Sequence, residues 1–198
     1  MVNYFALMGM PTDFALYEGQ LAANLRRLQQ QYHPDMQSGD GQAVPTPAVP
    51  TIDLSHLNAE QQSALINTAY HTLKSVDSRA LHLLALRGLT LSPNASIADG
   101  EFLVRAMEFR IELDEADSTS LPTLKAELND WLQQNTAEFA AAYAELVALP
   151  EQVSADHPMA KRALAVAQRL QFLVKVSQDV AKTADQLAQA DDDTDLYV

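Results

Sequence analysis

The sequence predicts an all-α protein with two helical domains, an N-terminal helical hairpin and a C-terminal three-helix bundle. The chain is rich in Ala, Leu and Gln and has few β-branched runs, a composition that favours helices. Its 6 Gly in 198 residues argue against a loop-rich or all-β protein, and its hydrophobic fraction of 47% is ample for a folded core. Apolar residues also recur at steps of three and four, which is the spacing of one helix face.

The first two predicted helices precede a proline. A short helix begins after Asn3, a residue type favoured at the N-cap, and ends before Gly9. A second helix runs from about residue 17 to residue 32. Its apolar face is formed by residues at steps of four, three and four, namely Leu21, Leu25, Leu28 and Tyr32. Pro34 cannot donate a backbone hydrogen bond and pushes the residue before it out of the helical region, so the helix must stop there.

A loop and a third helix follow. Residues 38–51 contain two glycines and three prolines, and we expect this stretch to be disordered. The next helix spans about residues 55 to 73 and is expected to pair antiparallel with the second helix. The hairpin would then display the tripeptide His33-Pro34-Asp35 at one end, on a turn at the surface.

A fourth helix, about residues 78 to 87, closes the first domain, for which we predict the bounds 1–88. Gly88 is its expected C-cap, because glycine adopts the left-handed conformation that ends many helices. Residues 90–96 carry Pro93 and form the expected hinge to the second domain.

The second domain is predicted to span residues 97–198 as a three-helix bundle with an acidic tail. Its helical patterns cover about residues 99–117, 121–149 and 158–190. The last pattern carries a long apolar stripe with bundle-core spacing, formed by Ala163, Val166, Leu170, Leu173, Val180, Ala184 and Leu187. The acidic run at 191–195 is expected to be a solvated, frayed tail.

The helix predicted near residues 99–117 has two apolar stripes. One is formed by Phe102, Ala106, Phe109 and Leu113, and the other, on the far side, by Leu103, Val104, Met107 and Ile111. A helix in a small bundle needs one apolar face. The second stripe is therefore either buried against another element or exposed as a partner-binding site.

Phe172 is a second candidate for partner binding. It lies about 200° from Leu170 and about 100° from Leu173 around the helix, so it leaves the predicted core stripe. Its helical neighbours are polar, and an aromatic residue among them is a good anchor for a partner. The alternative is that Phe172 packs beneath an adjacent helix or the first domain.

His33 and Asp35 could be read as an acid/base pair. A hydrolase would also need a nucleophile or metal and an oxyanion site, and the neighbouring residues supply none, so we predict no catalytic residues. The plain alternative is a turn that only ends a helix. Arg26 and Arg27 lie away from the apolar stripe of the second helix, either as a docking face or as an ordinary solvated face.

Composition limits the possible partners and cofactors. The net charge is −13, with 5 basic and 7 acidic side chains in residues 1–90 and 8 and 19 in residues 91–198. Nucleic acid and anionic membrane are therefore unlikely partners for this chain. With 0 Cys the chain has no thiolates for iron–sulfur ligation. No apolar run approaches the roughly 20 residues that span a bilayer.

Several absences complete these expectations. We expect no signal peptide, because no basic segment with an apolar core opens the chain, and we expect a cytoplasmic monomer. We expect no cofactor and no metal. The remaining histidines, which show no metal-ligand spacing and are expected at helix surfaces or boundaries, are His56, His71, His82 and His157.

The sequence resembles the J domain of DnaK-type co-chaperones. The matching stretches are residues 3–11 (NYFALMGMP), 28–35 (LQQQYHPD) and 66–73 (INTAYHTL), with Arg79-Ala80 and Leu83-Leu84 after them. Residues 102–115 (FLVRAMEFRIELDE) resemble the start of the client-binding domain of the HscB family, the J-type co-chaperones of iron–sulfur cluster assembly. The resemblance covers nearly the whole chain, except the loop after Asp35 and the acidic C-terminus.

The resemblance implies a function. The chain would stimulate the ATPase of a DnaK-type chaperone, HscA, through His33, Pro34 and Asp35, with Arg26 and Arg27 as a basic docking face. It would deliver the iron–sulfur scaffold protein, IscU in bacteria, to that chaperone. The residues implied in scaffold binding, to which we add Phe172, are Leu103, Val104, Met107, Glu108, Ile111 and Glu115.

Two positions depart from the family pattern. Met36 stands where a lysine commonly follows the tripeptide, which suggests weaker electrostatic steering of the chaperone or a dedicated partner. Ile111 stands where an acidic residue is common, which makes the second stripe more apolar.

Three other interpretations stay open. A J protein that serves a different client would keep His33 and Arg26 but make no use of Leu103, Met107 and Phe172. A helical enzyme would use His33 and Asp35 as a dyad. A structural helical module would have a turn without a partner.

Overall fold

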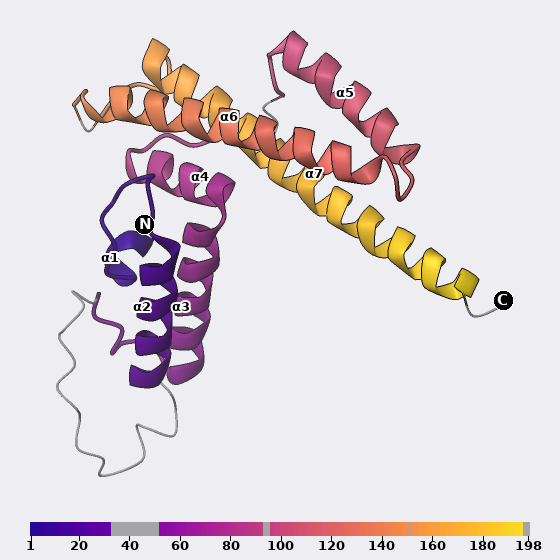
Figure 1. The fold of residues 1–198 in the computed structure, drawn as a ribbon. Helices are drawn as coiled ribbons and strands as arrows, with labels where there is room; N and C mark the ends of the chain where they lie inside the picture. Colours follow the sequence, from indigo (N-terminus) through magenta and orange to yellow (C-terminus); the bar gives the residue numbers. More distant parts are fainter. Residues whose placement is uncertain (33–51, 93–95, 151, 196–198) are drawn as a thin grey trace. The chain divides into compact units, whose positions relative to one another are not determined.

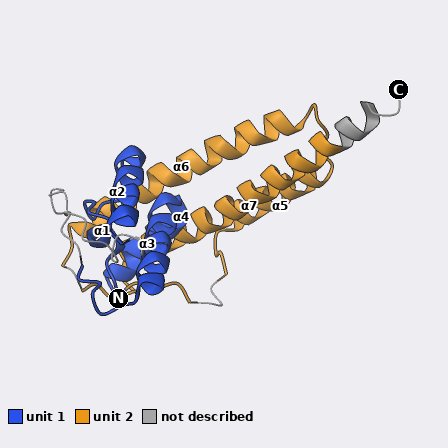
Figure 2. Cartoon of the chain, turned by 90° about the horizontal axis from the view of Figure 1, so that it is seen from below, with its two compact units in different colours: residues 1–88 blue, residues 89–198 orange. Residues whose placement is uncertain are grey.

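The computed structural model describes residues 1–32, 52–92, 96–150 and 152–195, and for residues 190–195 it describes the backbone only. Within these ranges the chain forms seven helices and no strand, so the predicted all-α class is confirmed. The chain divides into two compact units, residues 1–88 and residues 89–198 (Figure 2). Among the described helices, none combines the length and the apolar character that crossing a bilayer requires.

Unit 1 contains four described helices. They are α1 (Tyr4–Leu7), α2 (Glu18–Gln31), α3 (Ala59–Lys74) and α4 (Val76–Leu86). Helices α2 and α3 lie side by side and run in opposite directions, which is the predicted hairpin (Figure 1). The side-chain amide of Gln29 donates to Asn67 Oδ1 across this pair at 3.3 Å. The loop predicted at 38–51 lies outside the described residues.

Local hydrogen bonds set the ends of these helices. Asn3 Oδ1 accepts from the Ala6 amide at 3.2 Å, which makes Asn3 the N-cap of α1 as predicted. Helix α3 starts at Ala59 instead of residue 55, because Asn58 and Gln61 form a capping box. Asn58 Oδ1 accepts from the Gln61 amide at 2.9 Å, and Gln61 Oε1 accepts from the Asn58 amide at 3.1 Å. Gly88 follows α4 with a φ of 75°, the left-handed conformation expected of a glycine that ends a helix.

The core of unit 1 contains a polar side chain that the apolar pattern does not reveal. On α2, Leu21 and Leu28 are buried, whereas Leu25 and Tyr32 of the predicted stripe are half-buried. Asn24 is buried on the same face, and its Nδ2 donates to the carbonyl oxygen of Met8 at 2.8 Å. The largest fully buried side chains of this unit are Phe5, Leu7, Met8, Leu21, Leu28, Leu54, Ile66, Leu73, Leu83 and Leu84. The hydrogen bond of Asn24 therefore fixes the segment after α1 against α2 inside this core.

Unit 2 contains three described helices, α5 (Gly100–Asp114), α6 (Leu121–Val147) and α7 (Pro158–Asp195). Helices α6 and α7 form a long hairpin, and α5 lies along one half of it, so the predicted three-helix bundle is present (Figure 1). Helix α7 continues five residues beyond its predicted end at 190. The helix can continue because no Gly or Pro interrupts residues 159–195. That the acidic run at 191–195 is solvated and frayed stays a prediction.

The core of unit 2 follows the predicted stripe on α7. Five of its members are buried, and the other two, Ala184 and Leu187, are partly buried against the same core. The indole ring of Trp131, on α6, packs against two rings of α5, at centroid distances of 4.9 Å from Phe102 and 6.5 Å from Phe109. These ring contacts fix α5 on the hairpin and so orient the rest of its surface.

Candidate partner-binding surfaces

The residues predicted to bind the chaperone lie on α2 and in the segment after it. Arg26 is exposed and Arg27 is half-buried. Because Leu21 and Leu28 are buried, the face of α2 that carries Arg26 is directed away from the core of unit 1. His33, Pro34 and Asp35 lie outside the described residues, so the placement of the tripeptide stays a prediction.

Helix α5 carries apolar residues on two faces, as its sequence predicts. The first predicted stripe is buried, with exposed fractions of 5% for Phe102, 4% for Ala106, 3% for Phe109 and 7% for Leu113. The second stripe is exposed, with fractions of 39% for Leu103, 57% for Val104, 67% for Met107 and 58% for Ile111. These four residues, Leu103, Val104, Met107 and Ile111, are called the α5 stripe below. The sequence left open whether the second stripe is buried against another element. Against the described elements it is not buried.

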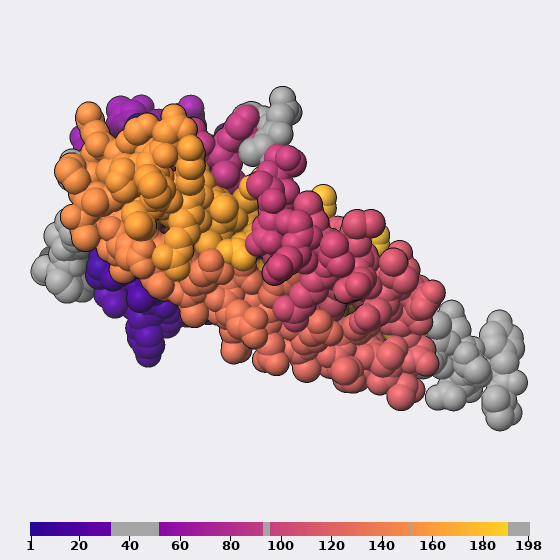
Figure 3. All heavy atoms as spheres, turned by 90° about the horizontal axis from the view of Figure 1, so that it is seen from above, coloured from indigo at the N-terminus to yellow at the C-terminus, as the bar shows by residue number. Residues whose placement is uncertain are grey.

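Carboxylates border the α5 stripe. Glu108 and Glu115 are both exposed. By helical spacing Glu108 lies beside Val104 and Ile111, and Glu115 lies beside Ile111. Figure 3 shows the residues of α5 at the surface of unit 2. The surface that α5 offers is thus an apolar centre with carboxylates along one side and Arg110 along the other, so basic groups of a partner would meet the side of Glu108 and Glu115.

Phe172, on α7, is half-buried instead of standing free among polar neighbours. Its ring meets the ring of Phe102 edge-on at a centroid distance of 5.6 Å. The guanidinium carbon of Arg110 lies 5.5 Å from the centroid of the Phe172 ring. The ring of Phe172 therefore packs in part against α5, and its role as an anchor for a partner stays a prediction. Spacing within α7 could not reveal this, because both contacts come from another helix.

Three arginines of unit 2, which no local sequence pattern indicates, contact both an aromatic ring and a carboxylate. They are Arg105, Arg110 and Arg169. Arg105 lies over Trp131 at 4.4 Å and pairs with Glu127 at 3.2 Å. Their ion-pair partners are 22 to 70 residues away in sequence, so no local spacing could have indicated them.

His82 is buried, with an exposed fraction of 7%, so the expectation that it lies at a surface or boundary is wrong. Its Nε2 accepts from the Tyr4 amide at 3.0 Å, and its ring stacks on the Tyr4 ring at 4.4 Å. Burial lowers the pKa of His82, because the charged imidazolium loses its solvation in the core. The residue therefore acts as a neutral acceptor that helps to hold α1 in unit 1. Among the residues described, no cluster of three or more His, Asp or Glu could hold a metal ion.

Comparisons with known proteins all indicate the same family, and the matches to full-length relatives cover nearly the whole chain. Residues 98–181 match the family described as "HSCB C-terminal oligomerisation domain". A co-chaperone protein HscB homolog of Acinetobacter baumannii is 34% identical over 196 residues, which cover 98% of both chains. Another HscB homolog, from Pseudoalteromonas atlantica, is 31% identical over 188 residues, which cover 94% of this chain and 99% of the homolog.

Two solved structures have the same fold. The chaperone HscB of Vibrio cholerae superposes with a TM-score of 0.68 at 28% identity, over 94% of this chain and 99% of that one. Human co-chaperone HscB superposes with a TM-score of 0.72 over 93% of this chain and 83% of that one, and at 20% identity this likeness concerns the fold alone. The description of the matched family as an oligomerisation domain concerns that family, and the monomer expected from the sequence stays a prediction for this chain.

Proposed function

This chain belongs to the HscB family of co-chaperones, and we propose that it stimulates the ATPase of a DnaK-type chaperone of the HscA type and delivers an IscU-type iron–sulfur scaffold protein to it. The observation that carries the client half of this proposal is the α5 stripe. In this account the protein breaks no covalent bond itself. It binds two proteins through two sites, one in each unit.

The α5 stripe has the properties of a binding surface. A helix that already buries one apolar face against its own core gains nothing in folding from a second one left in water. Contiguous exposed apolar side chains on a soluble protein commonly mark a site where another protein binds. Met107 is the most exposed of the four, at 67%, and a partner that covered it would remove the largest apolar side-chain area from water.

The border of the α5 stripe indicates the chemistry of the client. Glu108 and Glu115 are exposed beside it, and residues 91–198 hold 8 basic against 19 acidic side chains. A client with lysines or arginines along one side of an apolar patch would be attracted to this surface and oriented on it. Phe172 contributes in this proposal only through its accessible part, because Phe102 and Arg110 cover the rest.

The chaperone half of the proposal rests on the tripeptide and on α2. His33, Pro34 and Asp35 follow α2 in sequence after its C-cap Tyr32, and Arg26 is exposed on that helix. Binding of this surface to the chaperone would stabilise the hydrolysis-competent conformation of the chaperone, which shifts its population towards that state. The positive charge of Arg26 and Arg27 would chiefly raise the association rate.

Single-turnover ATP hydrolysis by the HscA-type chaperone tests the chaperone half. The wild-type protein should accelerate hydrolysis, and His33→Gln should abolish the acceleration. His71→Gln is the matched control, because His71 is an exposed histidine of the same unit that lies outside the proposed site. An unchanged acceleration with His33→Gln would contradict the J-type function.

Titration with the purified IscU-type scaffold tests the client half. Met107→Ala should weaken binding about tenfold, which is the effect of truncating a well-covered apolar residue at an interface. Val147→Ala is the matched control, since Val147 is also apolar and exposed, at 48%, but lies on α6. Equal affinities of wild type and Met107→Ala would remove the α5 stripe as the client site. Stimulated hydrolysis without any scaffold binding would indicate a J-type co-chaperone with a different client.

A further inference from the structure

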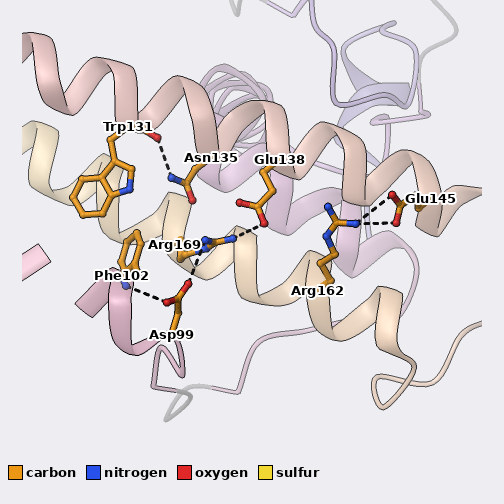
Figure 4. Close-up of polar contacts among 8 residues, drawn as sticks. All are labelled: Asp99, Phe102, Trp131, Asn135, Glu138, Glu145, Arg162 and Arg169. Carbon is orange, nitrogen blue, oxygen red and sulfur yellow. Dashed lines mark hydrogen bonds and ion pairs between the residues drawn. The ribbon is translucent and has the colours of Figure 1, made fainter. Parts of the chain in front are cut away.

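The guanidinium of Arg169 connects all three helices of unit 2. Arg169 lies on α7, and its Nη2 is 2.7 Å from Glu138 Oε1 on α6. Its Nη1 is 3.4 Å from Oδ2 of Asp99, the N-cap residue of α5. Figure 4 shows this guanidinium between the two carboxylates, with the ring of Phe102 beside it. The cluster Asp99–Arg169–Glu138 therefore joins the start of α5 to the α6–α7 hairpin.

Asp99 has two functions in this cluster. Its Oδ1 accepts from the Phe102 amide at 3.0 Å, which caps the first turn of α5. Its Oδ2 receives the guanidinium of Arg169. Because one carboxylate both caps the helix and pairs with α7, the ion pair holds the first turn of α5 and not only a flexible side chain. The negative charge is also favoured at this end of a helix.

Arg169 is the most buried of the three arginines that link α5 to the hairpin. Its side chain has an exposed fraction of 17%, compared with 42% for Arg105 and 48% for Arg110. Exposed pairs are screened by water and salt, so the pairs of Arg105 with Glu127 and of Arg110 with Asp179 contribute little. Of the three connections, that of Arg169 is screened least.

We propose that Arg169 is a positioning residue that holds the N-terminal end of α5 on the α6–α7 hairpin and thereby fixes the α5 stripe for the client. Leu103 and Val104 of the stripe lie within the first turns of α5, directly after the capped turn. Displacement of that turn would displace both side chains relative to Met107 and Ile111. This inference rests on the proposed function in one respect only, namely that the α5 stripe receives the scaffold.

Trp131 provides a reporter for the position of α5. It is the only tryptophan of the chain, its exposed fraction is 4%, and its ring lies 4.9 Å from that of Phe102. Arg169→Gln removes the charge that pairs with Asp99. The emission of Trp131 should then move to longer wavelength, and acrylamide should quench the fluorescence of its indole more strongly. Amides of α5 should exchange with solvent about tenfold faster, while those of α6 and α7 keep their protection.

Arg162→Gln is the matched control. Arg162 Nη1 pairs with both oxygens of Glu145, at 3.2 and 3.0 Å, and so joins α7 to α6 without reaching α5 (Figure 4). This variant should leave the Trp131 emission and the exchange of α5 unchanged. A shift of equal size in both arginine variants would contradict the proposal.

Asp99→Asn keeps the capping acceptor of Asp99 and removes its charge. Asparagine caps helices as well as aspartate does, but it lacks the charge that pairs with Arg169. This variant should show the same Trp131 response as Arg169→Gln, and the double variant should show no more than either alone. Additive responses, or no response to Asp99→Asn, would contradict a joint action of the two residues on α5.

Scaffold titration connects the cluster to client binding. Arg169→Gln should weaken scaffold binding several-fold, although Arg169 is not part of the α5 stripe, and Arg162→Gln should not. A Trp131 response without any change in scaffold affinity would overturn the link to the client. The fluorescence and exchange measurements contain no client. Failure of the wild-type protein to bind scaffold would therefore contradict the proposed function, while these measurements would still test whether the cluster holds α5 on the hairpin.

Discussion

The two units of this protein depart in different ways from the usual arrangement of apolar side chains inside and polar side chains outside. Unit 1 buries polar residues: of the five buried polar or charged side chains among the described residues, four lie there, namely Asn24, Gln62, Asp77 and His82. Unit 2 exposes apolar residues on its helices, namely Leu103, Val104, Met107, Ile111 and Val147. In the described part of the chain, every large apolar side chain that is exposed on a helix belongs to unit 2.

The difference separates folding from binding. A buried polar group must form hydrogen bonds within its own unit, so it fixes the internal arrangement of unit 1. An exposed apolar side chain contributes nothing to the core of unit 2, so its use depends on a partner. Substitutions at the two kinds of position should therefore differ in what they change, stability in the first case and association in the second.

The largest effect on stability is expected from the buried face of α5. Phe109→Ala removes a ring that is 3% exposed and packs against Trp131, and it should lower the free energy of unfolding of unit 2 by about 3–5 kcal/mol. Urea unfolding followed by the fluorescence of Trp131 measures this change. A loss below about 1 kcal/mol would mean that α5 does not pack as described.

A smaller loss is expected from the buried polar group of α2. Asn24→Ala leaves the carbonyl oxygen of Met8 without its 2.8 Å hydrogen bond and should cost about 1–3 kcal/mol. Gln30→Ala, an exposed change on the same helix, should change the stability by less than about 0.5 kcal/mol. Urea unfolding followed by circular dichroism compares the two variants, and equal stabilities would contradict a structural contribution from Asn24.

Unit 1 should also lose stability in mild acid because of His82. The pKa of His82 is lowered in the folded state from the unfolded value of about 6.5. Below that pH the unfolded chain binds a proton at His82 more readily than the folded chain, which favours unfolding. The contribution is therefore complete above about pH 6.5 and decreases as the pH falls towards the folded pKa. His82→Gln keeps an acceptor for the Tyr4 amide but does not titrate, so its loss of stability between pH 7.5 and pH 5.5 should be smaller. Identical pH slopes for the two proteins would contradict this account.

The smallest effect on stability is expected from the α5 stripe. Met107→Ala changes a side chain that is 67% exposed and should alter the free energy of unfolding by less than about 0.5 kcal/mol. Comparison of its urea unfolding curve with that of the wild type measures the difference. A loss of 2 kcal/mol or more would indicate that Met107 packs inside the protein, and it would remove the contrast between the two faces of α5.

Much of the fold could be predicted from local patterns. Asn3, Gly88 and Pro158 lie at helix ends that the sequence itself marks, and the two stripes of α5 follow from helical spacing alone. The predicted start of α3 at residue 55 lies before the observed start at Ala59, because the capping box of Asn58 and Gln61 sets the first helical residue. Local patterns thus fix which helices exist better than where each one starts.

The contacts that the sequence did not reveal have a common physical cause. Asn24, His82 and Phe172 each depend on a contact with a segment distant in sequence, respectively Met8, Tyr4 and Phe102. Periodicity within one helix assigns a polar residue to the surface, although tertiary hydrogen bonds can satisfy it in a core. The same limit hides Arg169, because its two carboxylate partners come from two other segments.

Single-turnover ATP hydrolysis by the HscA-type chaperone, measured with and without the IscU-type scaffold, tests most directly whether two sites of this protein act together. The wild type should stimulate hydrolysis further when scaffold is present. Met107→Ala should keep the stimulation seen without scaffold and lose the additional part, and His33→Gln should lose both. Full additional stimulation with Met107→Ala and equally with Leu103→Ala would contradict the account.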